Sequence, residues 1–298
     1  MKHWLSLVAV PEVEQFVEVA RFAEELGFHG ITVADHLVMP TQITKSRYPY
    51  TPDGKMWWPD ETPWPDPWIT ITAMGVATRK IEFATNIYLA ALRDPFTAAR
   101  AVAAASVYTG GRVACGVSAG WIEEEYEMLG LDFHSRGRRL DETVTVLRKL
   151  WSGESVSHHG EFFNFDHALM SPKPVKPVPV WSGGASKAAL KRAANNDGWL
   201  AVPMTAAQLE KTVLYLHSLR KENGKENEHF EVCGSLLEHL TPERQERLES
   251  IGVHGIGTAP WIITPWGRAP WLKENEDPAE LDVKKKAMER YAAYFFKR

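Results

Sequence analysis

Residues 111–125 read "GRVACGVSAGWIEEE", in which a glycine turn leads into a short apolar run and then into small residues, a tryptophan and three acids. The run Val113–Val117 has the composition of a buried strand. Ser118, Ala119 and Gly120 allow the backbone to approach a ligand closely. The acids after Trp121 suit a helix N-terminus, where negative charge is stabilised. The stretch therefore predicts a strand, a small-residue turn and a helix.

The same alternation runs along the whole chain. Strands are expected at Trp4–Val10, Gly30–Ala34, Ile81–Ile87, Val113–Val117, Val178–Ser182, Trp199–Val202, Phe230–Leu236 and Val253–Thr258. Helices are expected at Val13–Leu26, Pro67–Thr78, Pro95–Tyr108, Ile122–Leu129 continuing in Arg138–Trp151, Ala185–Asn195, Ala206–Glu222, Pro242–Ser250 and Pro278–Phe296. Eight such units predict a parallel (β/α)₈ barrel that forms one domain over residues 1–298. An open doubly wound sheet usually has a glycine-rich turn after its first strand, where this chain has Pro11 and Glu12.

Composition excludes several classes of partner and site. The chain has 298 residues, a net charge of -4 and no basic stripe, which argues against nucleic acid. Cys115 and Cys233 lie in apolar runs without C-x-x-C spacing, so we expect buried thiols and neither a disulfide framework nor a zinc site. The stretch "SVSHHGEFFNF" from Ser155 predicts a surface hairpin, where neighbouring histidines cannot share a metal. No run of ~18 apolar residues and no signal sequence is found, so we expect a cytoplasmic protein that acts on small molecules.

Two long loops follow strands two and eight, at residues 36–66 and 260–278. In a barrel, the loops after the carboxyl ends of the strands form the active face. These loops carry half of the 12 tryptophans, namely Trp57, Trp58, Trp64, Trp261, Trp266 and Trp271. Each tryptophan could simply pack its loop onto the barrel rim, but their crowding favours flat apolar walls for a ring-shaped ligand.

A second small-residue turn lies in "VWSGGASKAAL", residues 180–190. Gly183 and Gly184 precede an expected helix whose free N–H groups could hold a phosphate. The same Gly-Gly pair is also expected in a tight turn between a strand and a helix that binds no ligand.

Five segments together resemble the bacterial luciferase-like monooxygenase family, whose members are (β/α)₈ barrels that use FMN or the deazaflavin coenzyme F420. These segments are "ADHLVMP" from Ala34, "YPYTPDG" from Tyr48, "LRDPFTAARAVAAASVYTGGRVACGVSAGW" from Leu92, "GRRLDETVTVLRKLWSG" from Gly137 and "PVPVWSGGASKAALKRAANNDGW" from Pro177. The Asp-His pair, the Gly-Trp pair and the length are most similar to the branch of F420-dependent oxidoreductases.

The resemblance implies roles for residues at the ends of strands two and three. Asp35 and His36 would lie beneath the coenzyme ring, with His36 as catalytic acid or base. A histidine with an unperturbed pKa of ~6.5 suits proton transfer near neutral pH. Family members often have a cis non-proline peptide after strand three, which corresponds to Asn86 and Ile87.

The resemblance also places coenzyme contacts after strands four and five. Ala119 and Gly120 match backbone contacts, Glu124 lies near a position that often contacts the coenzyme, and Gly183 and Gly184 match the phosphate turn.

One departure bears on the substrate. Sugar-phosphate dehydrogenases of this branch carry a glutamate where this chain has Trp121. With Trp57 and Trp58, Trp121 therefore predicts a pocket for a less polar molecule, such as a secondary alcohol, a ketone or an activated alkene.

Three functions follow from the resemblance. The first is hydride transfer between F420 and an organic substrate, and the second is an FMN-dependent monooxygenase supplied with reduced flavin by a separate reductase. The third is a flavin-binding protein without turnover. A homodimer is expected in each case.

Overall fold

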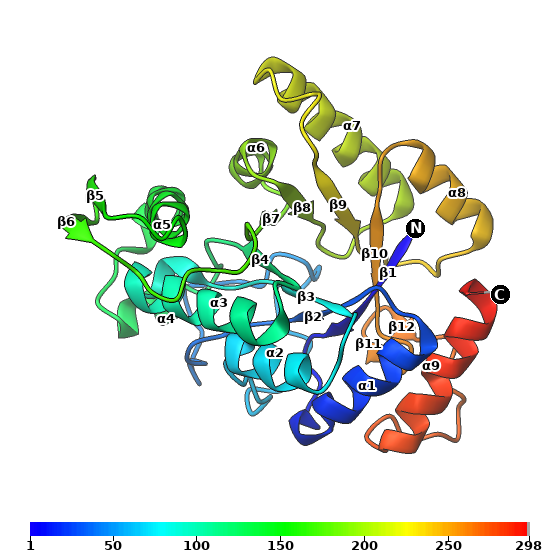
Figure 1. The fold of residues 1–298 in the computed structure, drawn as a ribbon. Coiled ribbons are helices and arrows are strands. Elements are labelled where there is room, and N and C mark those ends of the chain that lie inside the picture. The colour runs from blue at the N-terminus through cyan, green and yellow to red at the C-terminus, as the bar shows by residue number, and fades with distance from the viewer. Residues whose placement is uncertain (297–298) are drawn as a thin grey trace.

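The computed structural model describes residues 1–296 and contains a closed barrel of eight parallel strands (Figure 1). Around the barrel the order is β1-β10-β9-β8-β7-β4-β3-β2. The strands are β1 (Lys2–Leu7), β2 (Gly30–Val33), β3 (Glu82–Thr85), β4 (Val113–Val117), β7 (Val180–Gly183), β8 (Gly198–Leu200), β9 (Glu231–Gly234) and β10 (Gly255–Thr258). The predicted (β/α)₈ barrel is confirmed.

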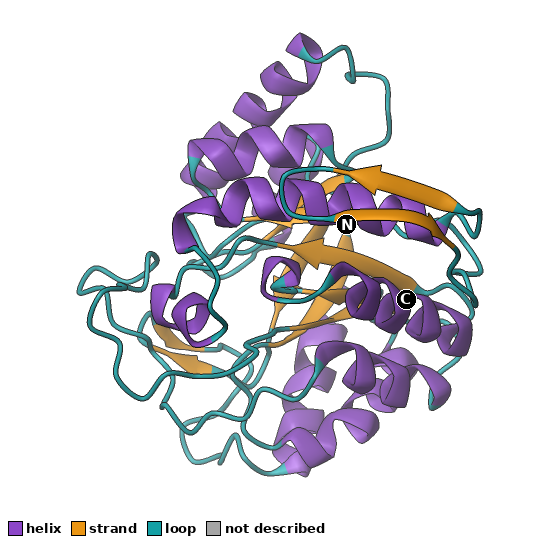
Figure 2. Ribbon diagram, turned by 90° about the vertical axis from the view of Figure 1, so that its left-hand side faces the viewer, coloured by secondary structure: helices purple, strands orange, loops and turns teal. Residues whose placement is uncertain are grey.

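Helices surround the strands on the outside of the barrel (Figure 2). They are α1 (Phe16–Leu26), α2 (Pro67–Val76), α3 (Pro95–Thr109), α4 (Glu123–Met128), α5 (Arg136–Trp151), α6 (Lys187–Asn195), α7 (Ala206–Glu222), α8 (Pro242–Ser250) and α9 (Leu281–Phe295). Short 3₁₀ turns occur at η1 (Val13–Gln15), η2 (Ala90–Leu92) and η3 (Phe133–Ser135). Two hairpins stand apart from the barrel, β5 (Val156–His159) with β6 (Asn164–Ala168), and β11 (Ile263–Thr264) with β12 (Gly267–Arg268).

Local sequence signals explain where several helices begin. The Asp66 carboxylate accepts hydrogen bonds from the amides of Trp68 and Ile69, and Pro67 occupies the first turn of α2. Thr205 forms a capping box with Gln208 at the start of α7. Such caps satisfy amide groups that have no partner within the helix.

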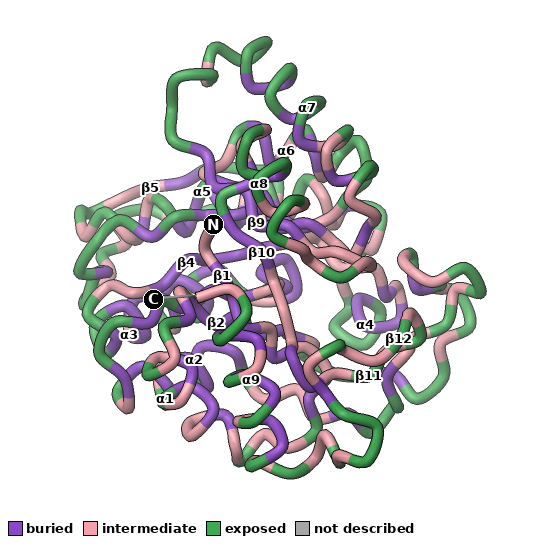
Figure 3. Tube along the Cα trace, turned by 90° about the vertical axis from the view of Figure 1, so that its right-hand side faces the viewer, coloured by how far each residue is buried: buried purple, intermediate pink, exposed green. Residues whose placement is uncertain are grey.

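The interior of the barrel is filled by tryptophans near the amino-terminal ends of the strands. The rings of Trp4 and Trp181 meet edge to face, with centroids 5.5 Å apart. A Cβ atom at Gly30 would lie 2.3 Å from the Trp4 ring, and one at Gly198 would lie 2.5 Å from Trp181. Glycine is required at both positions because the indole rings occupy that space. The interior at this end is therefore solid, and Figure 3 shows the strands as largely buried.

α4 and α5 correspond to the expected segments Ile122–Leu129 and Arg138–Trp151, and a break separates them. Gly130 has φ +67° and ends the helical path after α4. Asp132 then accepts a hydrogen bond from the amide of His134 and begins η3, so α5 starts at Arg136. A glycine followed two residues later by an aspartate is the signal for this break.

Three smaller expectations can be compared with the structure. The segment from Ser155 forms the predicted hairpin β5–β6. Cys115 and Cys233 are free and buried, and burial raises the pKa of each thiol to about 12. Within residues 1–296, no helix is long and apolar enough to cross a membrane, and no group of three or more potential ligands could hold a metal ion.

His3 makes the stability of the barrel sensitive to acid. Its ring Nδ1 lies 2.7 Å from the Tyr291 hydroxyl of α9, and burial lowers its pKa to about 4. The unfolded value is about 6.5. Because the folded pKa is the lower one, the stabilisation is complete above about pH 6.5 and is lost as the pH falls through about 4.

We therefore expect His3→Gln to reduce the acid sensitivity of folding. The parent's unfolding midpoint should fall between pH 7.5 and 4.5, and the variant's should fall less, as measured by thermal denaturation. His159→Gln, on the exposed hairpin, is the control and should keep the parent's pH dependence. An unchanged pH dependence in His3→Gln would contradict the assignment.

Candidate functional site

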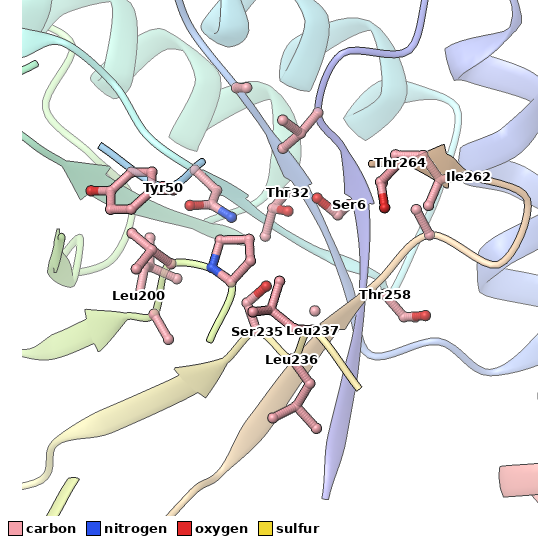
Figure 4. Close-up of a pocket in the computed structure, with 18 of the residues that line it drawn as sticks. Ser6, Thr32, Tyr50, Leu200, Ser235, Leu236, Leu237, Thr258, Ile262 and Thr264 are labelled. Atoms are coloured by element: carbon pink, nitrogen blue, oxygen red, sulfur yellow. The ribbon is translucent and has the colours of Figure 1, made fainter. Parts of the chain in front are cut away.

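A cavity of about 390 Å³ opens at the carboxyl ends of the strands, above the tryptophan-filled part of the barrel. Residues at or just after several strand ends line it, and Figure 4 shows them around one space: Ser6, Thr32, Leu200, Ser235, Leu236, Leu237 and Thr258. Ile262 and Thr264 approach from the segment after β10. The volume lies within the range of about 300–1,000 Å³ that is usual for small-molecule sites.

Aromatic side chains from the two long loops form the cavity wall. Five of the six loop tryptophans line it, namely Trp57, Trp58, Trp64, Trp266 and Trp271. The sixth, Trp261, is only 2% exposed and belongs to the hydrophobic core, so for that residue loop packing is the better explanation. The rings of Trp57 and Trp58 meet edge to face at 5.3 Å.

Tyr48 connects the loop wall to the turn after β4. Its ring lies edge to face against Trp58 at 5.1 Å and against Trp121 at 5.3 Å. Burial raises the pKa of Tyr48 to about 12, so its hydroxyl keeps its proton at neutral pH. The structure thus brings the three expected pocket tryptophans to one cavity.

His36 follows β2 and lines the cavity. Its ring packs edge to face against Trp64, with centroids 4.9 Å apart. Its Nδ1 atom lies 3.6 Å from Oε2 of Glu125 and has no hydrogen-bond partner among the described residues. The imidazole is therefore held between an aromatic wall and a buried acid.

Asp35 has its carboxylate fully occupied by protein groups. Arg93 donates to both oxygens, with each distance 2.8 Å, and the Leu89 amide donates to Oδ2 at 2.9 Å. Burial raises the pKa of Asp35, whereas Arg93 and the amide oppose that shift. Asp35 thus contributes to the cavity lining mainly by fixing the backbone beside His36.

The peptide bond between Asn86 and Ile87 is cis, as the resemblance implied. Both residues line the cavity. Ile87 packs against the end of β7, where a Cβ atom on Gly183 would lie 2.7 Å from Ile87 Cγ2. Gly184 also lines the cavity and has φ +103°, a conformation that other residues rarely adopt.

The residues expected after β4 lie in different environments. Gly120 lines the cavity with φ +74°. Ala119 is not among the lining residues, and its carbonyl accepts a hydrogen bond from the Tyr126 hydroxyl at 2.6 Å.

Glu124 is also absent from the lining. Its Oε1 accepts hydrogen bonds from the amides of Thr44 and Lys45, each at 2.7 Å, and its Oε2 accepts one from the Ser46 hydroxyl. Burial opposes ionisation, but these donors lower the pKa of Glu124 to about 2. The carboxylate therefore anchors the loop after β2.

Sequence reasoning missed Arg93 and Glu125. Arg93 lies in the quoted segment "LRDPF", and Glu125 is the third of three consecutive acids. Charged residues that stand beside other charged residues are usually exposed to solvent, yet Glu125 is only 1% exposed. Tyr48 lies in the family-like segment "YPYTPDG", in which no sequence signal points to a role of its own.

Comparisons with known proteins agree with the barrel fold. The family model described as luciferase-like monooxygenase matches residues 2–294. An uncharacterized protein of Mycobacterium tuberculosis (strain ATCC 25618 / H37Rv) is 32% identical over 248 residues, which cover 83% of this chain and 85% of the relative.

Two relatives with named activities are also similar. The F420-dependent glucose-6-phosphate dehydrogenase of Nakamurella multipartita is 29% identical over 229 residues, 75% of this chain and 62% of that protein. The FMNH₂-dependent dimethylsulfone monooxygenase of Pseudomonas putida is 34% identical over 137 residues, 44% of this chain and 38% of that protein.

Among solved structures, monooxygenase RslO1 from Streptomyces bottropensis superposes with a TM-score of 0.71 at 16% identity, covering 99% of both chains. An F420-dependent secondary alcohol dehydrogenase in complex with an F420-acetone adduct gives a TM-score of 0.65 at 22% identity, covering 100% of this chain and 91% of that one. Because both identities are below 25%, these two similarities show the fold alone.

Proposed function

The chain belongs to the luciferase-like monooxygenase family, and we propose that it transfers a hydride between coenzyme F420 and a small, relatively apolar organic substrate. The observation that carries this proposal is the aromatic cavity at the carboxyl ends of the strands, with His36 in its wall. Support for F420 comes from the named dehydrogenase relative, whose match spans three quarters of this chain, whereas the FMNH₂-dependent relative matches less than half.

The residues present fit a flat tricyclic ring. The cavity edge consists of small residues where a ring would need close backbone approach, at Ser118, Gly120, Gly183 and Gly184. Ile87 supplies an apolar side chain at the same edge. Flat rings are best accommodated between apolar walls with a few polar groups at the margin.

The start of α6 fits an anionic coenzyme tail. Ser186 caps the helix by accepting a hydrogen bond from the Ala189 amide. Other amides of this first turn are left to point outward, where they would attract a phosphate. The Gly183–Gly184 turn leads directly into this helix from the cavity edge.

The cavity lining is compatible with an apolar substrate, because its charged residues are engaged by protein groups. Asp35 is paired with Arg93, the Glu238 carboxylate accepts a hydrogen bond from the Ala206 amide, and Arg268 donates to the Lys273 carbonyl. Each of these charged side chains already has a protein partner. A substrate would therefore meet mainly indole rings, aliphatic groups and hydroxyls.

When bound, F420 would supply the hydride acceptor or donor. His36 would exchange the proton of the substrate oxygen as the carbon gains or loses its hydride. The tryptophan wall would exclude water from the reacting groups and orient the substrate. The Asp35–Arg93 pair would hold the backbone of His36 in place during the reaction.

An FMN-dependent monooxygenase is the second candidate. The similarity to the FMNH₂-dependent enzyme of Pseudomonas putida favours it, because the matched segment is 34% identical. This function requires reduced flavin from a separate reductase.

We expect purified protein to bind F420 more tightly than FMN, because the longer of the two matches is to the F420-dependent relative. Fluorescence titration with each coenzyme measures this directly. Tighter FMN binding, together with substrate-dependent oxygen uptake from reduced FMN, would favour the monooxygenase. Binding without turnover across alcohols, ketones and activated alkenes would favour a flavin-binding protein.

Lys187→Glu should weaken coenzyme binding about 3- to 30-fold, because the change replaces an exposed positive charge by a negative one at the start of α6. Replacing Gly183 or Gly184 would be less informative, since the first substitution clashes with Ile87 and the second strains the backbone. Lys191→Glu, exposed one turn farther along α6, is the matched control. Equal affinities of both variants and the parent would exclude a phosphate at this helix.

His36→Ala should lower turnover by about 10²- to 10⁴-fold, the usual contribution of general acid–base catalysis. Coenzyme affinity should change little. The measurement is single-turnover oxidation or reduction of bound coenzyme at saturating substrate. A variant as fast as the parent would show that the proton travels by another route.

A further inference from the structure

Glu125 is a buried acid that belongs neither to the proposed coenzyme site nor to the substrate pocket. It lies in α4 and is 1% exposed. Its Oε1 accepts hydrogen bonds from the amides of Leu37 at 2.8 Å and Val38 at 3.3 Å. These two residues directly follow His36, so one carboxylate oxygen fixes the backbone that carries the imidazole.

The second oxygen of Glu125 faces the imidazole itself. Oε2 lies 3.6 Å from Nδ1 of His36. That nitrogen is sealed from solvent and has no hydrogen-bond partner in the part of the chain that the structure describes. A buried polar nitrogen without a partner is unfavourable, and the Glu125 oxygen lies only about 0.4 Å beyond the usual upper limit of hydrogen-bond distance.

The other charged groups near His36 are already engaged. Asp35, its chain neighbour, is paired with Arg93. Glu124 is occupied by the amides of Thr44 and Lys45 and by Ser46.

The remaining surroundings are aromatic. Trp58 and Trp64 pack on the His36 ring, and the nearby Tyr48 hydroxyl keeps its proton. Glu125 is thus the acid in contact with the imidazole.

We propose that Glu125 is a positioning residue that accepts a hydrogen bond from the Nδ1–H group of His36. A carboxylate can only accept, so Nδ1 must carry the proton of the neutral ring. Nε2 is then left with a free lone pair, on the side of the ring that is not sealed against Glu125. Hydrogen bonds of this kind are often long without ligand and shorten in the complex.

The tautomer of His36 tests this proposal without coenzyme or substrate. Nitrogen-15 NMR at a pH where the ring is neutral distinguishes a protonated Nδ1 from a protonated Nε2. The His36 signals are assigned by their loss in His36→Gln. We expect Nδ1 to be protonated in the parent, and a parent ring protonated mainly at Nε2 would overturn the proposal.

Glu125→Gln should reverse the tautomer. Glutamine keeps an oxygen that can accept from the Leu37 and Val38 amides, but its NH₂ group donates to Nδ1 and thereby favours the Nε2–H form. Glu124→Gln is the matched control, because it changes the adjacent acid and leaves the Glu125 contact in place. The tautomer should reverse in the first variant. In the second, Nδ1 should stay protonated even if loss of the Glu124 charge alters the loop and shifts the signals slightly.

If the ring of Glu125→Gln keeps the parent tautomer in the folded protein, the proposal is wrong. If that variant does not fold, the measurement on the parent alone still decides between the two tautomers.

The catalytic meaning of this contact rests on the proposed function, and a separate measurement addresses it. We expect Glu125→Gln to lower the single-turnover rate at least tenfold with little change in coenzyme affinity. A reversed tautomer with an unchanged rate would confirm the positioning contact and refute proton transfer by His36. An unchanged tautomer with a lowered rate would refute the contact and leave the proposed function standing.

Discussion

The bidentate ion pair between Asp35 and Arg93 is the interaction on which the geometry of the candidate site depends. It joins the first residues after β2 to the segment after η2, and Oδ2 of Asp35 also holds the Leu89 amide. Two planar groups with two parallel hydrogen bonds allow little rotation. Because His36 directly follows Asp35, the ion pair also restrains the His36 backbone. Glu125 adds a second restraint by accepting hydrogen bonds from the amides of Leu37 and Val38. The proton transfer proposed for His36 would need such fixed placement, because small displacements reduce rates strongly.

The two ends of the barrel serve different purposes: one end is packed and stabilises the fold, and the other end contains the cavity. Trp4 and Trp181 fill the interior near the amino-terminal ends of the strands, and the glycines beside them leave the space that the indole rings need. At the opposite ends, small residues and loops leave a cavity instead. The loops can therefore vary in sequence and change the ligand without disturbing the packed half of the barrel.

Much of the architecture was predictable from local patterns, because each βα unit carries its own strand, cap and turn signals. Asp66 and Thr205 initiate helices through contacts within four residues, and the hairpin from Ser155 is equally local. The resemblance to a family located His36 and the cis peptide at Asn86 and Ile87. The partners of His36 and Asp35 could not be predicted, since Glu125 and Arg93 are distant in sequence and their chemistry depends on burial.

The three consecutive glutamates of α4 show why spacing alone cannot assign roles. Burial differs along this short helix: Glu124 turns toward the loop amides at Thr44 and Lys45, and Glu125 toward the backbone after His36. Glu123 instead donates its backbone amide to the Ser46 hydroxyl. Acids at a helix start are favoured by the helix dipole wherever they point, so composition gives no hint of these differences.

What distinguishes the three glutamates is the long loop after β2, which passes over α4 and presents unpaired amides that need acceptors. The loop that forms the aromatic wall is thus held by the same short helix that carries the acid facing His36. The aromatic wall and the His36 imidazole are therefore both held by α4. A chain with a long loop can in this way keep the cavity wall and the imidazole in a fixed relation.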